Sequence, residues 1–308
     1  LKGRLEILGN LMFEKLHYEL GFPYRRCGII VAAFSEEEVA EVRRLYRQGV
    51  ENRVPRIELC SAERMLELEP KLAPDVAGGL YAPGGGVVEP YRYVFSLLEL
   101  AKRNGVEFLS NCKLENASFA DGAWTLQAHD GRRIRAKYAV NAAGLHADDV
   151  SRIFGAEEFR ISARKGEEYL LDRHTQASVS KVIFPVPSKV SKGILVIPTV
   201  EGTIMIGPTA EMVQDKEDVG TSSDNLHRIL TQVKHMISGI SVNDVITSFA
   251  GMRPTMPGDD FYIDISGKAP HFIQVAGIQS PGLTASPAIG EYVKDLLKKD
   301  GLVLVEKD

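Results

Sequence analysis

Apolar residues recur along this chain with two different spacings, one typical of helices and the other of strands. A helical spacing of three or four residues predicts helices over residues 1–20, 36–49, 90–105 and 223–238, and a last helix that begins at Pro287. Between them, short apolar or alternating runs predict strands, and Asp130-Gly131 predicts a hairpin turn between two such runs. Helices and strands therefore alternate in some parts of the chain and separate in others.

The order of these elements predicts a discontinuous organisation in two parts. Helix–strand units at 90–157 and 271–300 are typical of layered α/β structure, whereas 20–80 and 160–250 are typical of an antiparallel sheet with peripheral helices. We therefore predict a dinucleotide-type α/β part that is interrupted twice by a β-rich cap. The predicted α/β part comprises residues 1–20, 89–157 and 246–308, and the predicted cap comprises residues 21–88 and 158–245.

Composition and charge exclude several classes of protein. The 308 residues carry a net charge of −4 without a basic arm, so we expect no nucleic-acid partner. No apolar run approaches the ~18 residues of a membrane span, and the first residues form a charged amphipathic pattern that differs from a signal peptide. Cys27, Cys60 and Cys112 lie far apart, without a CxxC motif or a histidine at metal-ligand spacing. We expect reduced thiols, no bound metal and a cytoplasmic protein.

The most unusual stretch is "QVAGIQSPGLTASPAIGEYVKDLL", residues 274–297, in which an apolar strand leads through a Gly- and Pro-rich loop into the last helix. Ser286 can cap a helix that begins at Pro287, so that backbone N–H groups point back into the loop. A helix N-terminus attracts an anionic or electron-rich group, and Gly282 removes a side chain that would keep a flat ring away. A capped helix after a Gly-Pro turn explains the same residues equally well. The spacing around Ser280 differs from the G-x-S-x-G of a nucleophile elbow.

Two other loops offer candidate binding groups. In "AVNAAGLHADDV" the small residues Ala143 and Gly144 follow an apolar strand, where the backbone can approach a diphosphate or simply pack a strand against a helix. In "GMRP" Arg253 follows a strand, and its planar guanidinium can hold a carboxylate or a phosphate. A surface ion pair is the alternative role for this arginine.

The predicted cap sheet carries a third group of candidates. Lys165 and Tyr169 in "ARKGEEYLLD" and Thr209 in "IGPTAE" can line a polar pocket on the sheet. An ordinary half-buried aromatic residue in a strand explains Tyr169 as well.

Six stretches of the chain occur in a characteristic order. They are "GGLYAPGGGVVEPYRYVFSLLELAKRNGV", "AVNAAGLHADDV", "KGEEYLLD", "IGPTAE", "GMRP" and "GIQSPGLTASPAIGEYV". Their order and separations resemble the D-amino-acid-oxidase-like superfamily of FAD-dependent oxidoreductases over essentially the whole chain. Within it, the chain is most similar to the anaerobic glycerol-3-phosphate dehydrogenase flavoprotein and the L-2-hydroxyglutarate oxidase branch. The resemblance implies a glutathione-reductase-like FAD-binding α/β domain and a discontinuous antiparallel-sheet substrate domain.

The resemblance also assigns roles to individual residues. The loop from Gly282 to Thr284 would lie at the isoalloxazine ring, Ala143 and Gly144 along the diphosphate and ribose, and the strand edge near Leu114 at the adenine. Arg253 would bind the phosphate or carboxylate of the substrate. The implied cofactor contacts are Leu114, Ala143, Gly144, Gly251, Ile278, Gly282, Leu283 and Thr284, and the further substrate-binding candidates are Tyr169, Lys165 and Thr209.

One departure from the family pattern concerns the N-terminal region. Members begin with a strand, a G-x-G-x-x-G turn, a helix and an acidic residue, and this sequence lacks that fingerprint. Gly84-Gly85-Gly86 does not fit, because Glu89 stands where the last glycine belongs. We therefore expect an N-terminally incomplete FAD domain that lacks roughly 60 residues, twice the ~30-residue βαβ unit that carries the fingerprint. The strands that would neighbour this missing unit would have exposed edges, through which the chain could self-associate.

The implied reaction is hydride transfer from the carbinol carbon of a small anionic 2-hydroxy substrate to flavin N5. We favour sn-glycerol 3-phosphate, giving dihydroxyacetone phosphate, over L-2-hydroxyglutarate, and amine or amino-acid oxidation is a further alternative. Electrons would pass to an acceptor subunit, a quinone at the inner face of the membrane, or oxygen. His146, His174 and His271 are available as a base, but none is assigned this role. The alternative of another class is a non-catalytic fragment that does not hold FAD.

Overall fold

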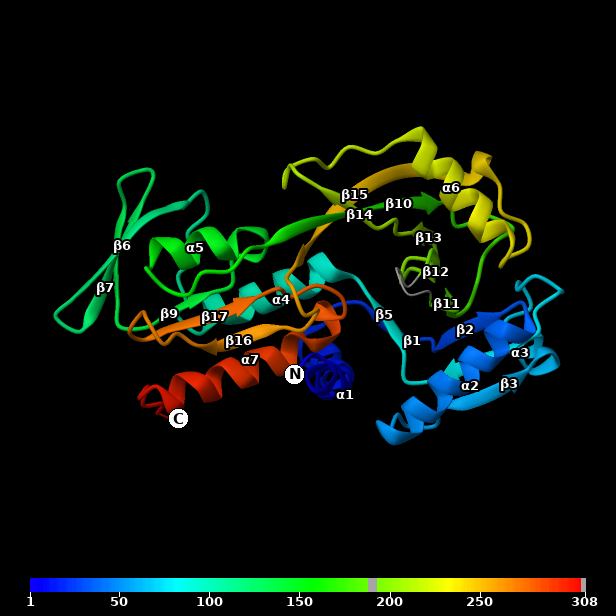
Figure 1. The fold of residues 1–308 in the computed structure, drawn as a ribbon, viewed down its shortest axis with the longest axis horizontal. Helices are drawn as coiled ribbons and strands as arrows, with labels where there is room; N and C mark the ends of the chain where they lie inside the picture. Colours follow the sequence, from blue (N-terminus) through cyan, green and yellow to red (C-terminus); the bar gives the residue numbers. More distant parts are fainter. Residues whose placement is uncertain (188–192, 306–308) are drawn as a thin grey trace.

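The computed structural model describes residues 1–187 and 193–305, and in these residues the strands form one large sheet and three small ones. Figure 1 shows the large sheet in one half of the molecule and the small sheet around β17 in the other half, with the long strands β10 and β15 running between them. This mixed α/β arrangement agrees with the expected fold class.

The large sheet has the order β14-β10-β13-β12-β11-β2-β4-β3, and β15 pairs with β10 outside this path. Its pairs are antiparallel except β11–β2, a parallel pair that joins the two segments of the predicted cap. The strands are β2 (Ile29–Ala33), β3 (Glu58–Ser61), β4 (Gly78–Ala82), β10 (Ser162–Leu171), β11 (Val182–Pro185), β12 (Leu195–Pro198), β13 (Ile204–Gly207), β14 (Glu211–Val213) and β15 (Val245–Thr255).

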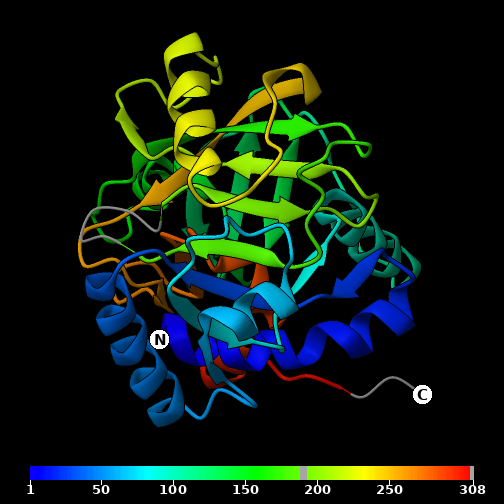
Figure 2. The same ribbon diagram turned by 90° about the vertical axis from the view of Figure 1, so that its right-hand side faces the viewer.

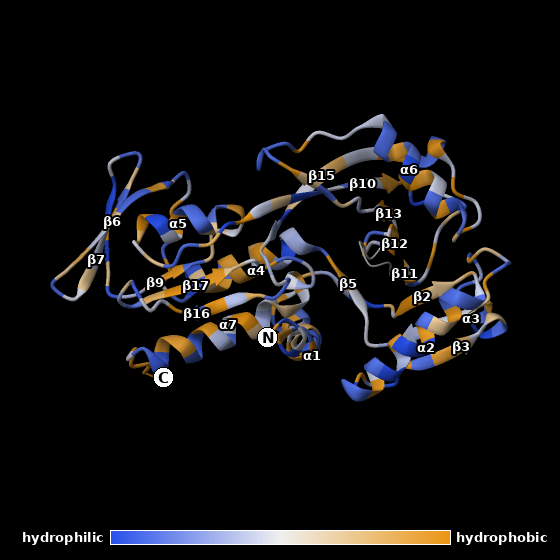
Figure 3. Ribbon diagram, in the orientation of Figure 1, coloured by the Kyte–Doolittle hydropathy of each residue, from blue (hydrophilic) through white to orange (hydrophobic). Residues whose placement is uncertain are grey.

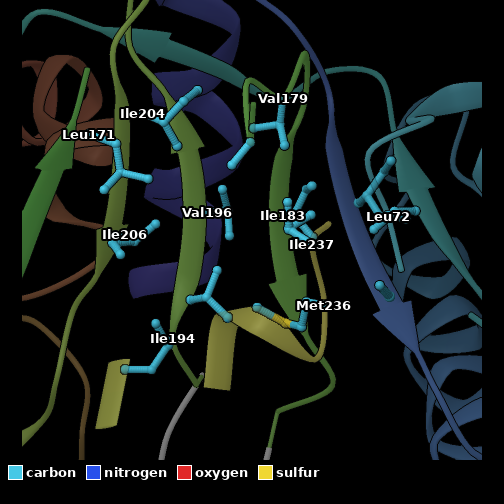
Figure 4. Packing of buried hydrophobic residues seen from close by; sticks show 14 of the residues in the cluster. Leu72, Leu171, Val179, Ile183, Ile194, Val196, Ile204, Ile206, Met236 and Ile237 are labelled. Atoms are coloured by element: carbon cyan, nitrogen blue, oxygen red, sulfur yellow. The ribbon is translucent and has the colours of Figure 1, made fainter. Parts of the chain in front are cut away.

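The two faces of the large sheet are covered differently. One face packs on α3 (Ala62–Leu68) and α6 (Ser223–Lys234) and contains the largest hydrophobic core, which Figure 4 shows at close range. On the opposite face, α2 (Glu36–Glu51) covers β2, β3 and β4, at one end of the sheet. That face is therefore not covered by α2 over β10, β12, β13 and β15. Figure 2 shows the strands of the large sheet with α6 at the top and α2 at the lower left.

The second large core lies between the small sheet and two helices. The sheet has the order β16-β17-β9, with β16 (Tyr262–Ile265), β17 (Phe272–Ala276) and β9 (Ala139–Asn141), and its core-facing helices are α1 (Lys2–Leu20) and α7 (Gly282–Lys299). Figure 3 shows the hydrophobic colour concentrated on these three strands. Ile289 and Leu296 of α7 are buried in this core, as their helical spacing predicts.

The remaining elements connect the two halves or extend the small one. The antiparallel meander β6-β7-β8 packs on α5, and β1 pairs with β5 beside α1. These elements are β1 (Tyr24–Arg26), β5 (Gly86–Val88), α4 (Pro90–Arg103), β6 (Leu114–Ala120), β7 (Ala123–Ala128), β8 (Arg133–Ala136), η1 (Gly144–His146), α5 (Ala147–Ile153) and η2 (Val242–Asp244).

Several local features agree with the predicted helix bounds and with the predicted hairpin. α1 ends at Gly21, whose φ of 71° is the left-handed conformation that favours glycine at a helix end. The hydroxyl of Ser35 accepts a hydrogen bond from the Glu38 N–H and caps α2. Asp130-Gly131 joins β7 and β8 as a tight turn. By contrast, most of the apolar face of α4 is exposed, with Val94 and Phe95 at 55% and 59%.

The boundary of the predicted cap near residue 246 cuts through a strand. β15 is assigned by that division to the α/β part, yet it is hydrogen-bonded to β10 from Thr255 opposite Ser162 to Val245 opposite Leu171. A single long strand therefore belongs to the large sheet and also leads towards the small one. The two-part division stays a prediction in which β15 is shared.

Within the described residues, every helix is too short or too polar to cross a lipid bilayer. In the same part of the chain, no group of three or more His, Cys, Asp or Glu side chains is arranged to hold a metal ion. The three cysteines are free thiols, and burial, together with the nearby Glu58, raises the pKa of Cys60 to about 11.

The two helices of the small half approach most closely at Gly9 of α1. A Cβ atom at Gly9 would lie 2.1 Å from the carbonyl oxygen of Thr284 and 2.9 Å from the Cα of Ala285, in the first turn of α7. Both neighbours are backbone atoms, which cannot rotate away. The position of the first turn of α7 therefore depends on a residue without a side chain in α1.

We predict that Gly9→Ala lowers the free energy of unfolding by about 1–3 kcal/mol, because the added methyl group must push two packed helices apart. Urea denaturation measures this change. Gly3→Ala is the matched control, since a Cβ at Gly3 meets nothing within 4 Å. In that exposed helical position alanine should stabilise by up to about 1 kcal/mol. Equal effects of the two substitutions would contradict the close approach.

Candidate functional site

The first part of the candidate site is the carboxyl edge of the small sheet. β9 and β17 are parallel, with Asn141 opposite Gln274, so their carboxyl ends meet at the same edge. The loop after β9 contains Ala143 and Gly144, and the loop after β17 leads to Gly282. Two loops that the sequence analysis selected separately therefore emerge side by side, at the edge where open α/β sheets bind ligands.

A buried hydrogen-bond network holds the turn after β9. The Asn141 side-chain amide donates to the Ala147 carbonyl and to the Gln274 side-chain oxygen, both at 2.8 Å. Gln274 donates in turn to the Ser151 hydroxyl at 2.6 Å. Gly144 has a φ of 57°, and a Cβ there would meet nothing within 4 Å. The network fixes a turn whose outer surface is open to a ligand.

The last helix begins five residues earlier than the sequence pattern predicts. α7 starts at Gly282, so Pro287 lies inside the helix and Ser286 is not its cap. The prediction was wrong because the missing N–H of Pro287 is compensated locally. The Leu283 carbonyl, which Pro287 cannot bond, accepts a hydrogen bond from the Ser286 hydroxyl at 2.8 Å instead.

This earlier start places Leu283 and Thr284 in the first helical turn. An α-helix offers no carbonyl of its own to the N–H groups of its first turn, and its dipole is positive there. Leu283 is 43% exposed, so this end of the helix is accessible. A Cβ at Gly282 would lie 2.7 Å from Cγ2 of Ile278, so this glycine also has a packing role within the chain. The glycine makes room for Ile278, a residue of the same loop.

The second part of the candidate site is a cavity of about 710 Å³ between the two halves of the molecule. Leu283 and Thr284 line it on one side, and β10, β12, β13 and β15 contribute the face of the large sheet that α2 does not cover. β1, β5, α1 and the start of α4 complete the wall. The first turn of α7 therefore lies at a partly open cavity that is large enough for a small ligand and a flat ring.

The alternation of side chains along β10 decides which candidates face this cavity. Glu168 and Leu170 line it. Lys165 and Tyr169 belong to the opposite set of positions, because neighbouring residues of a strand point to opposite faces. The Lys165 ammonium bonds the Asp218 carboxylate at 2.8 Å, and the Tyr169 hydroxyl donates to the Ser222 carbonyl at 3.0 Å.

Thr209 is also occupied by contacts within the chain. It is buried, and its hydroxyl accepts a hydrogen bond from the Glu167 N–H at 2.9 Å. The structure thus places Lys165, Tyr169 and Thr209 outside the set of residues that line the cavity.

Arg253 lies on the cavity face of the large sheet, next to the lining residues. It is directly opposite Arg164 on β10, and its guanidinium extends over Gly166, where a Cβ would lie 2.4 Å from Nη2. The guanidinium also donates weak hydrogen bonds of 3.3 and 3.4 Å to the Thr209 carbonyl. Burial lowers the pKa of Arg253, although the nearby Glu168 acts in the opposite direction. A half-buried, incompletely paired arginine favours an anionic partner.

Three residues of the cavity were not selected from the sequence. Burial raises the pKa of Glu168 despite the neighbouring Arg253. Glu89 is only 7% exposed, and its Oε2 has no hydrogen-bond partner in the described structure. The hydroxyl of Tyr24 is likewise buried without such a partner. In "SARKGEEYLL" neighbouring side chains alternate between the two faces of the strand. Because Leu171 faces the core, this alternation places Glu168 on the other face and could have identified it. No sequence signal marks Glu89 or Tyr24.

The other candidates lie away from the cavity. Leu114 is on the edge strand β6, packed in the cluster around Trp124. His146 contacts Asp149 and Glu217, and His271 contacts Asp300. No histidine is among the described residues that line the cavity.

The comparison with protein families decides the identity of this arrangement. Residues 2–296 match the family described as FAD dependent oxidoreductase. This chain belongs to that family. The match confirms the resemblance that the six sequence stretches indicate.

Three relatives describe the family context. The chain is 40% identical to the glycerol 3-phosphate dehydrogenase of Caloramator mitchellensis. The match covers 100% of this chain and 64% of that protein. It is 30% identical to the glycerol 3-phosphate oxidase of Mycoplasma pneumoniae, covering 94% of this chain and 77% of the relative. Human mitochondrial L-2-hydroxyglutarate dehydrogenase is 24% identical, and the match covers 96% of this chain and 75% of the human protein. The chain thus spans somewhat less than two thirds of the Caloramator protein.

A solved structure of the Mycoplasma oxidase shows the same architecture. That structure is dithionite-reduced and has FAD bound, and it superimposes on this chain with a TM-score of 0.90 at 29% identity. The match covers 96% of this chain and 79% of the Mycoplasma chain. The fold observed here is therefore that of an FAD-dependent oxidoreductase.

We predict that Asn141→Ala lowers the free energy of unfolding by about 1–3 kcal/mol, because it leaves the side-chain oxygen of Gln274 buried without a donor. Asn116→Ala, at an exposed position of β6, is the matched control and should change stability by less than about 0.5 kcal/mol. Thermal or urea unfolding distinguishes the two. A neutral Asn141→Ala variant would show that the network does not hold the turn.

Proposed function

We propose that this protein is an FAD-dependent dehydrogenase or oxidase of a small anionic 2-hydroxy substrate, and that the substrate is sn-glycerol 3-phosphate. The observation that carries the proposal is the cavity itself. The first turn of α7 lies on one wall, and the opposite wall carries Glu168, with Arg253 on the same sheet face. The 40% identity with a glycerol 3-phosphate dehydrogenase supports the choice of substrate.

The residues of the first turn of α7 fit a flavin ring. The N–H groups of Leu283 and Thr284 and the positive end of the helix dipole are directed to the space where negative charge would need stabilisation. The open backbone at Gly144 fits an elongated anionic group at the carboxyl edge of the small sheet. Bound FAD would supply the two-electron acceptor, which amino-acid side chains do not provide.

The residues of the large sheet fit the substrate. Arg253 would hold the phosphate in the planar fork of its guanidinium. Leu170, Met205 and Phe249 line the cavity with apolar surface, which would exclude water from the reacting carbon. Oxidation of the secondary alcohol then removes the hydrogen on carbon as a hydride and the hydroxyl hydrogen as a proton, and leaves dihydroxyacetone phosphate.

A second candidate function is the oxidation of a small amine or amino acid. The acidic lining of the cavity favours it, because Glu89, Glu168 and Glu201 are suited to an ammonium group. L-2-Hydroxyglutarate is the other alternative, since an arginine binds carboxylate as well as phosphate.

The direct test is to incubate the protein with FAD and add each candidate substrate without oxygen. We predict that sn-glycerol 3-phosphate bleaches the visible flavin band, whereas L-2-hydroxyglutarate, glycine, sarcosine and proline do not. Reoxidation with oxygen or with a quinone then identifies the electron acceptor. Bleaching by an amine alone would replace the proposed reaction with amine oxidation. A protein that remains colourless after incubation with FAD would support a non-catalytic role.

For Arg253, we predict that Arg253→Ala raises the KM for sn-glycerol 3-phosphate by about 10–100-fold, as expected for the loss of a charge-assisted hydrogen bond. Arg253→Lys, which keeps the charge but not the planar fork, should have an intermediate KM. Steady-state kinetics with both variants measures this order. An unchanged KM in Arg253→Ala would remove Arg253 from the substrate site.

A further inference from the structure

The charges around the cavity are distributed unequally. Among the described residues that line it, three are acidic, namely Glu89, Glu168 and Glu201, and none is a lysine or an arginine. Arg253 is next to this lining on the same sheet face, and a second cation, Arg164, is directly opposite it. A ligand in the cavity can therefore have one anionic group neutralised by Arg253, while the rest of it faces carboxyl groups.

Glu168 is an acidic residue of the cavity lining that lies on the same sheet face as Arg253. The register of β10 and β15 places Arg164 opposite Arg253, Gly166 opposite Gly251 and Glu168 opposite Phe249, all on one face of the sheet. The two intervening glycines have no side chains, and a Cβ at Gly251 would meet nothing within 4 Å. The surface between Arg253 and Glu168 is therefore open on the β15 side.

The carboxyl group of Glu168 is not neutralised by its surroundings. It lies within the electrostatic reach of Arg253, but the two described side chains form no direct ion pair. Apolar residues flank it along the sheet, with Leu170 next on the same face and Phe249 across from it. An acceptor in such surroundings gains from a hydrogen-bond donor on a ligand.

Glu89 provides a second acceptor in the same cavity. It precedes α4 directly and is almost fully buried, and its Oε2 has no hydrogen-bond partner in the described structure. Arg92 forms a long ion pair with this oxygen at 3.7 Å, and the Tyr91 side chain interacts with the same carboxyl group. A buried carboxylate oxygen without a donor is rare in folded proteins and is suited to a donor from a ligand.

We propose that Glu168 determines the class of substrate that this cavity accepts: it binds a hydroxyl group of the substrate and excludes a second carboxylate. This inference rests on the proposed function. A hydroxyl donates a hydrogen bond to Glu168, with Glu89 available for another. A second carboxylate on the side away from Arg253 and Arg164 would lie next to Glu168, where the cavity lining has no cation to pair with it, and this is strongly unfavourable.

The two leading substrates differ in this respect. sn-Glycerol 3-phosphate has one anionic group for Arg253 and two hydroxyl groups that donate hydrogen bonds. L-2-Hydroxyglutarate has two carboxylates and one hydroxyl group. The cavity thus selects a phosphorylated or singly charged polyol over a dicarboxylate, and Glu168 makes this selection.

Binding of the two ketone products tests this selection without turnover. Isothermal titration of the FAD-loaded protein would give the Kd of dihydroxyacetone phosphate and of 2-oxoglutarate for the wild type and for Glu168→Gln. We expect the wild type to bind dihydroxyacetone phosphate at least about tenfold more tightly. Glu168→Gln keeps the shape and removes the charge, so the ratio of the two Kd values should fall by about tenfold, mainly through tighter binding of 2-oxoglutarate.

Two further variants control this experiment. Glu168→Asp keeps the negative charge and should still exclude 2-oxoglutarate. Glu63→Gln makes the same chemical change at an exposed position of α3 and should leave both Kd values unchanged.

A ratio that stays the same in Glu168→Gln, while sn-glycerol 3-phosphate still bleaches the wild-type flavin, would overturn the role of Glu168 alone. A wild type that prefers 2-oxoglutarate would overturn it as well. Failure of the wild type to bind either product, together with an unbleached flavin, would overturn the proposed function on which the inference rests.

Discussion

The first turn of α7 is held in position by its close contact with α1, and the rest of the candidate site is arranged around this helix end. Gly9 allows the backbone of α1 to touch the backbone at Thr284. The core between the small sheet, α1 and α7 fixes the helix axis. Because a helix N-terminus carries unpaired N–H groups, any displacement of α1 would change where those groups point. In the proposed function, the packing of α1 on α7 therefore also positions the helix end that would hold the cofactor.

The opposite wall of the cavity follows from the incomplete cover of the large sheet. Its core face is closed by α3 and α6, whereas on the other face α2 covers β2, β3 and β4 at one end of the sheet. The strands that α2 leaves uncovered present Glu168, Leu170, Met205 and Phe249 to the cavity, so the second face of this sheet is a candidate binding surface. The long pair β10–β15 joins this surface to the small half of the molecule.

The sequence predicted the kind and order of the elements better than the orientation of single side chains. The caps at Ser35 and Gly21, the hairpin at Asp130-Gly131 and the inward face of α7 depend on local residues and were predictable. The start of α7 was predicted five residues too late, because proline usually marks the first turn and the compensating bond from Ser286 to Leu283 is visible only in the structure.

In the candidate site, too, motifs were predicted better than the orientation of single side chains. Arg253 and the Leu283–Thr284 turn were selected from motifs, and the structure places both near one cavity. Lys165 and Tyr169 were selected without regard to the alternation of β10, which directs them to the face opposite Glu168. Glu89 could not be found from the sequence, because its burial depends on β1, β5 and α4, which come together only in the folded chain.

The central claim is that the first turn of α7 is where the flavin ring binds. Amide hydrogen exchange, resolved to single residues and compared with and without FAD, tests it most directly. We expect FAD to slow exchange at the amides of Leu283 and Thr284 and in the turn at Ala143 and Gly144. If FAD binds, as its visible spectrum would report, and exchange at these four amides is unchanged, the account is contradicted.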